Sequence, residues 1–72
     1  MRLKDLRVNK DISQKEIFIK LNLKQNTYSQ YETGKRQPSL EMLPKLAKIL
    51  DCTIDDVVMA LIETKNQAEE IF

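Results

Sequence analysis

The stretch of residues 13–39 constrains this chain more than any other, because it holds signals for two short helices, a tight turn and a basic loop. Its letters are SQKEIFIKLNLKQNTYSQYETGKRQPS. Ser13 followed by Glu16 is a capping box, in which each side chain satisfies a free backbone N–H at the start of a helix. The capping box predicts a helix that begins at Gln14.

The residues after this start predict where the first helix ends and the second one runs. Apolar residues at helical spacing give the first helix an inward face: Ile17, Phe18 and Leu21. Asn22 stands where this helix must stop, and Asn readily adopts the left-handed conformation that ends a helix. A second helix is predicted over residues 25–33, with Tyr28 and Tyr31 facing inward. Gly34 ends it, because glycine adopts positive φ without steric cost.

The outward face of this second helix carries amide and hydroxyl groups: Gln25, Asn26, Ser29 and Gln30. Base edges in the major groove of DNA are read by side chains that both donate and accept hydrogen bonds, and Gln or Asn can bond bidentately to adenine. The alternative is a polar face that meets only water. The short turn, the helix spacing and the basic loop that follows favour these four residues as base readers of double-stranded DNA.

From Leu3 to about Val58 the chain resembles the lambda-repressor-like, Cro/Xre-type helix-turn-helix regulators. The segments that carry the resemblance are, in order, LKDLR, SQKEI, LNLKQNTYSQYETGKRQPSLEML and KLAKILDCTIDDVV. The resemblance implies an all-α fold, a compact five-helix DNA-binding domain whose third helix enters the major groove. We divide the chain into a DNA-binding domain at residues 1–62 and a C-terminal helical extension or tail at residues 63–72.

The resemblance also implies roles for individual residues. It assigns contacts with DNA phosphates to Gln14, Thr33, Lys35 and Ser39, with Lys24 and Arg36 adding positive charge. It further implies an ion pair between Arg7 and Glu32, which would tie the first helix to the recognition helix. The competing interpretation is that Arg7 contacts a phosphate.

Two positions depart from the pattern of these regulators. Phe18 stands where a small Ala is usual, so either its ring points outward or the two motif helices are splayed apart. Lys24 stands where a Ser or Thr cap is usual. This second departure predicts a recognition helix that begins late, with Thr27 and Gln30 as a substitute capping box.

The remaining helices follow from caps and apolar spacing. Ser39 is predicted to cap a fourth helix with five inward residues: Leu40, Leu43, Leu46, Ala47 and Leu50. Pro44 falls in the first turns of that helix, where it bends the helix or delays its start. A fifth helix is predicted from near Ile54, with Thr53 and Asp56 as its capping box.

The C-terminal region carries an apolar seam at steps of three and four residues, typical of a helix that pairs with another. From this spacing we predict a homodimer interface formed by Val58, Leu61, Ile62, Ala68, Ile71 and Phe72. The alternative is a last helix that covers only the core of its own domain. If the homodimer forms, its two recognition helices should lie about 34 Å apart and match a palindromic operator.

Seventy-two residues make one domain with a modest core. The net charge of +1 hides an asymmetry. Residues 1–38 hold nine Lys and Arg against four Asp and Glu, and residues 39–72 hold three against seven. The half that contains the two-helix motif is therefore basic, which favours a nucleic-acid partner. The acidic half suggests the alternative function, a protein-interaction module such as an antitoxin or the partner of an anti-repressor.

The composition argues against an enzyme. The chain has no His, one Cys and no Gly-rich phosphate loop, so the usual catalytic constellations and metal-ligand sets are missing, and we expect no cofactor. Cys52 is expected to pack as a small apolar residue.

No apolar run is long enough to span a membrane, which favours a cytoplasmic protein. We therefore expect a transcriptional regulator, most simply a repressor.

Overall fold

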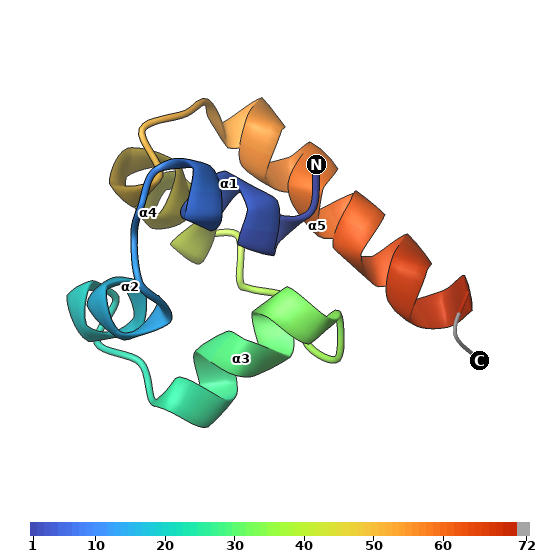
Figure 1. Cartoon of the computed structure of the whole chain (residues 1–72), viewed down its shortest axis with the longest axis horizontal. Coiled ribbons are helices and arrows are strands. Elements are labelled where there is room, and N and C mark those ends of the chain that lie inside the picture. Colours follow the sequence, from blue (N-terminus) through green and yellow to red (C-terminus); the bar gives the residue numbers. More distant parts are fainter. Residues whose placement is uncertain (71–72) are drawn as a thin grey trace.

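The computed structural model describes residues 1–70, with side chains up to residue 67, and these residues form five helices and no strand. The helices are α1 (Leu3–Asn9), α2 (Gln14–Lys20), α3 (Gln25–Thr33), α4 (Met42–Ile49) and α5 (Ile54–Glu70). The predicted all-α fold is thus confirmed. α3 runs along one edge of the molecule, and the last turns of α5 extend away from the body (Figure 1).

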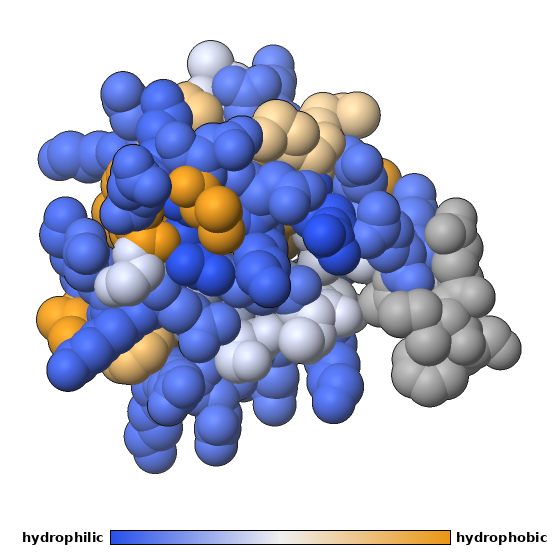
Figure 2. All heavy atoms as spheres, in the orientation of Figure 1, coloured by the Kyte–Doolittle hydropathy of each residue, from blue (hydrophilic) through white to orange (hydrophobic). Residues whose placement is uncertain are grey.

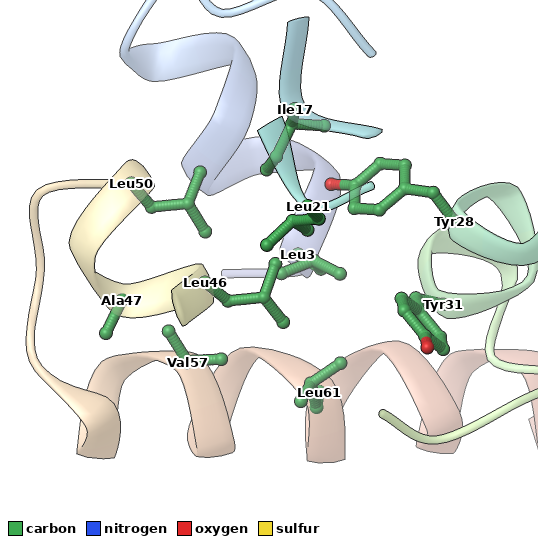
Figure 3. Close-up of a cluster of buried hydrophobic side chains, with 10 residues drawn as sticks. All are labelled: Leu3, Ile17, Leu21, Tyr28, Tyr31, Leu46, Ala47, Leu50, Val57 and Leu61. Carbon is green, nitrogen blue, oxygen red and sulfur yellow. The ribbon is translucent and has the colours of Figure 1, made fainter. Parts of the chain in front are cut away.

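One apolar core joins all five helices. Its ten buried residues are Leu3, Ile17, Leu21, Tyr28, Tyr31, Leu46, Ala47, Leu50, Val57 and Leu61. These side chains converge from α1, α2, α3 and α4 onto one face of α5 (Figure 3). Helices of seven to nine residues are too short to be stable alone in water, so this shared burial holds α1 to α4 in place.

Four residues in the left-handed region of backbone space end the four short helices. Gly34 has φ 81° after α3 and Asn22 has φ 56° after α2, as predicted. Asp11 after α1 and Asp51 after α4 have φ 55° and 52°. Asn and Asp tolerate this conformation better than other residues with a Cβ atom, because their short polar side chains can bond locally. Each such residue reverses the chain without a long loop.

The start of α4 differs from the prediction. The helix begins at Met42 after Glu41, and Ser39 does not cap it with its side chain. Pro44 is the third helical residue, where its missing N–H would have had no partner within the helix, so the proline does delay the helix start. Leu40 therefore lies in the preceding turn and is 84% exposed, and the prediction that it faces inward was wrong.

α5 begins as predicted. The N–H of Asp56 donates to Thr53 Oγ1 at 3.1 Å, and the N–H of Thr53 donates to Asp56 Oδ2 at 3.2 Å, which completes the capping box. The helix then runs without interruption through residue 62, where we had placed the domain boundary. Among residues 1–70, no helix is long and apolar enough to cross a membrane.

Candidate nucleic-acid interface

The turn between α2 and α3 is built from short local bonds. Ser13 Oγ accepts the N–H of Glu16 at 3.0 Å and so caps α2. At the other end of α2, the N–H of Leu23 donates to the carbonyl of Phe18 at 2.8 Å, across Asn22. Leu23 and Phe18 are both half-buried against the edge of the core. The chain is thereby turned so that α3 follows α2 after a few residues and packs against it.

The two faces of α3 differ as the sequence predicted. Tyr28 and Tyr31 are buried, and their rings meet edge to face with centroids 6.1 Å apart. On the opposite side Gln25, Asn26 and Gln30 are exposed, and Ser29, on the same side, is half-buried. Hydrophilic residues cover the edge of the molecule that α3 forms (Figure 2). The tyrosines therefore anchor the helix from within and leave its amide groups facing solvent.

The predicted range of α3, residues 25–33, is confirmed. The helix begins at Gln25, directly after Lys24, so the late start at Thr27 that the missing cap suggested was wrong. Lys24 makes no side-chain cap, but its carbonyl accepts the N–H of Tyr28 at 3.1 Å, which closes the first turn. Gln25 and Asn26 thus lie in the first turn of α3, on the end that α2 positions.

The basic loop after α3 folds back onto the helix at one atom, the carbonyl oxygen of Gln30. This oxygen accepts the N–H of Lys35 at 3.0 Å and the N–H of Arg36 at 3.2 Å. The Thr33 hydroxyl also donates to it, at 3.3 Å. Because Gly34 has positive φ, the chain can close this turn without strain. The backbone of Lys35 and Arg36 is therefore held at the C-terminal end of α3, and both side chains are exposed.

Comparison with known proteins identifies this arrangement. The helix-turn-helix family model matches residues 3–57. The chain belongs to this family. At 39% identity over 57 residues, or 79% of this chain and 51% of the relative, it is similar to the cryptic phage CTXphi transcriptional repressor RstR of Vibrio cholerae. It is 40% identical over 57 residues to the transcriptional regulator AnsR of Bacillus subtilis, covering 79% of this chain and 49% of AnsR.

A more distant relative aligns over more of the chain. The transcriptional activator BcrR of Enterococcus faecalis is 29% identical over 72 residues, covering 93% of this chain and 35% of BcrR. The chain spans about half the length of RstR and AnsR, and a smaller share of BcrR. No solved structure matches the chain.

In this helix-turn-helix protein, a polar cluster fixes the last turn of α3 to α1 and α2. Arg7 Nε donates to Glu32 Oε2 at 2.7 Å, and Arg7 Nη1 donates to the carbonyl of Ile12 at 2.8 Å. Gln14 Nε2 donates to Glu32 Oε1 at 3.4 Å, so the amide group of Gln14 lies within the protein's own network. The hydrogen bonds of Ile12 and Gln14 in this cluster could not be predicted from the sequence, since both depend on how α2 is placed.

Two ionisable groups in this cluster have raised pKa values. The hydrogen bonds that Arg7 donates to the Glu32 carboxylate raise the pKa of its guanidinium group above its usual range. Burial, with the Glu32 carboxylate adding to it, raises the pKa of the Tyr28 hydroxyl well above its usual range. That hydroxyl is fully buried and makes no hydrogen bond with the residues the structure describes. Both groups stay in their usual protonation states at neutral pH, so the cluster keeps one arrangement.

The residues predicted to form the dimer interface differ in their exposure. Leu61 is 6% exposed and belongs to the core of its own domain, so we correct its assignment as a dimer contact. Ile62 is exposed and Val58 half-buried on the outside of the helix. Three further residues of the predicted interface lie outside the part whose side chains are described: Ala68, Ile71 and Phe72.

The other phosphate-contact candidates lie at the surface near α3. Lys24, Thr33 and Ser39 are exposed, at the start of α3, at its end and in the turn before α4. Cys52 is half-buried against the core, as expected for a small apolar residue. Up to residue 67, no group of three His, Cys, Asp or Glu side chains is placed to hold a metal ion.

Proposed function

We propose that this protein is a sequence-specific double-stranded DNA-binding transcriptional regulator, a cytoplasmic repressor that binds a palindromic operator as a homodimer. The observation that carries the proposal is the division of α3. Its tyrosines are buried, its amides are exposed, and the Gln30 carbonyl holds the backbone of two exposed cationic residues at the end of the helix.

The base readers in this proposal are Gln25, Asn26, Ser29 and Gln30. An amide side chain can donate from its NH2 group to N7 of an adenine and accept, at its oxygen, from the exocyclic amine of the same base. Three amides on one face therefore favour A·T pairs in the operator. Residues 25–31 of α3 include no charged side chain, so the face that carries these amides is polar and uncharged. Ser29 is half-buried and its side chain is short, so it can reach only groups close to the helix.

The phosphate contacts in this proposal flank the reading face. Lys35 and Arg36 follow α3, Lys24 precedes it, and Thr33 and Ser39 offer hydroxyl donors nearby. Gln14 Nε2 has a second N–H, besides the one donated to Glu32, that can donate to a phosphate. Contacts of this kind fix position and add affinity without reading sequence. Specificity should therefore separate experimentally from affinity.

The direction of regulation and the oligomeric state rest on two further arguments. RstR is named a repressor, and it matches at 39% identity across the whole two-helix motif. A homodimer would use Val58 and Ile62 on the outer side of α5, together with residues 68, 71 and 72. Two copies related by a two-fold axis would read two half-sites about one helical turn, roughly 34 Å, apart.

The test is selection of bound sequences from a pool of random duplexes. We expect an inverted repeat whose half-sites are rich in A·T pairs and separated by about 10 base pairs. A retained pool with no common sequence would contradict sequence-specific binding. Stable co-purification with a partner protein, combined with no shift of any DNA, would favour the protein-interaction alternative instead.

A further inference from the structure

Thr64 is a buried polar residue in the middle of α5, seven positions beyond the part of the chain that the family model matches. It is 4% exposed, and both hydrogen-bonding functions of its hydroxyl group are used. Thr64 Oγ1 accepts the N–H of Leu3 at 3.0 Å and donates to the carbonyl of Ala60 at 2.8 Å. A buried hydroxyl with both partners in place fixes the groups that it joins.

The bond to Leu3 secures the start of α1. The N–H of the first helical residue has no partner within its own helix, so in the core it must find one elsewhere. The neighbouring residue of α5, Glu63, pairs with the amino group of Met1. Two consecutive residues of α5 therefore hold the first residues of the chain. α1 has only seven residues and one fully buried side chain, Leu3, so it depends on such anchors.

The other half of α1 is attached to the recognition helix. Arg7 donates two hydrogen bonds to Glu32, at 2.7 and 3.3 Å. Glu32 lies two residues after Gln30, one of the proposed base readers, and one residue before Thr33. α1 is thus a short rigid link, fixed to α5 at one end and to the last turn of α3 at the other.

We infer that Thr64 is a positioning residue for DNA reading: through α1 and the pair of Arg7 and Glu32, it sets how α3 is presented to the base pairs. The inference rests on the proposed function. It assigns to α5, beyond the part that the family model matches, a role in recognition. The hydroxyl group of Thr64, and not its volume, is what the role requires.

The experiment compares Thr64→Val with Thr64→Ser in the full chain. Valine keeps the shape and leaves the N–H of Leu3 without a partner, whereas serine keeps the hydroxyl group and is the matched control. Thr64→Ala, which also removes the hydroxyl group, replaces valine if the valine variant does not fold. Amide hydrogen exchange is measured first, without DNA. Binding to the selected operator and to random duplexes is then measured at a temperature where each variant is fully folded.

In Thr64→Val we expect the backbone amides of Leu3, Tyr31 and Glu32 to exchange faster than in the unmodified protein. In Thr64→Ser we expect their exchange to be as slow as in the unmodified protein. We expect the ratio of operator affinity to random-duplex affinity to fall about fivefold in Thr64→Val and to recover in Thr64→Ser. An unchanged ratio in a folded valine or alanine variant would overturn the inference and leave the proposed function standing. If the unmodified protein binds no duplex at all, the proposed function fails, and exchange at Glu32 alone then decides whether Thr64 acts on α3.

Discussion

Arg7 on α1 and Glu32 on α3, 25 residues apart in sequence, form a bidentate ion pair with nitrogen to oxygen distances of 2.7 and 3.3 Å. Their side chains are 12% and 6% exposed. The third nitrogen of Arg7 donates to the carbonyl of Ile12 in the loop before α2. One guanidinium group therefore connects three segments of the chain behind the reading face of α3.

Arg7→Ala should lower the free energy of unfolding by about 3 kcal/mol. The loss is large because the substitution leaves the Glu32 carboxylate buried without a counter-charge, which costs more than losing an exposed pair. Urea denaturation at neutral pH measures this change in the free energy of unfolding. Lys4→Ala, on the exposed side of the same helix, is the control and should change the value by less than about 0.5 kcal/mol.

The alternative role for Arg7, a phosphate contact, gives the opposite result. In that case Arg7→Ala would weaken DNA binding and leave the unfolding free energy unchanged. Such an outcome would show that the contact with Glu32 adds little to stability.

The helix ends show what the sequence can and cannot fix. Asn22 and Gly34 were predictable because few residue types tolerate positive φ, so their presence between two apolar patterns marks a turn. The start of α3 at Gln25 was not predictable from Lys24. A missing cap costs about 1 kcal/mol, and burial of the Tyr28 side chain outweighs that amount.

The spacing of apolar residues predicted burial less reliably than Asn22 and Gly34 predicted the helix ends. Leu40 fits the helical period of the residues after it, yet the helix starts at Met42, because Pro44 is tolerated only within a first turn. Leu61 and Thr64 fit the spacing of a dimer seam, yet both face the protein's own core. An intramolecular core and an interface between copies require the same period, so tertiary packing had to decide between them. The amide face of α3 was predictable because its exposure follows from the buried tyrosines.

Cys52 should react slowly with thiol reagents. Burial, with the Asp56 carboxylate adding to it, raises the pKa of the Cys52 thiol, so less of the reactive thiolate is present at a given pH. Alkylation by iodoacetamide at pH 8 should be several-fold slower in the folded protein than in the same protein unfolded in urea. Equal rates in the two states would mean that the thiol is not shielded as the structure indicates.

Gln30→Ala and Lys35→Ala should affect DNA binding in different ways. Gln30→Ala should reduce discrimination at one base pair by about 1 to 3 kcal/mol, because it removes a bidentate contact to a base edge. Lys35→Ala should weaken binding to all duplexes alike and lower the salt dependence by about one unit, because it removes one phosphate contact. Fluorescence anisotropy with the selected operator and single-substituted operators, over a range of salt concentrations, measures both.

The matched control for this pair is Lys48→Ala. Lys48 is exposed on α4, away from the two-helix motif, and carries the same charge as Lys35. Lys48→Ala should leave both the discrimination between base pairs and the salt dependence of DNA binding nearly unchanged. Equal losses on operator and random DNA for Gln30→Ala and Lys35→Ala would contradict the division into base and phosphate contacts.

The homodimer is tested by placing a charge on the outer side of α5. Ile62→Asp should shift the protein from dimer to monomer in sedimentation equilibrium at micromolar concentrations, because a carboxylate would be buried at an apolar interface without a partner. The unfolding free energy of the monomer should hardly change, since Ile62 is exposed within one chain. Glu63→Asp, one position along, keeps the surface charge and should leave the association unchanged. A monomeric wild-type protein at high micromolar concentration would remove the homodimer, and the operator would then consist of a single half-site.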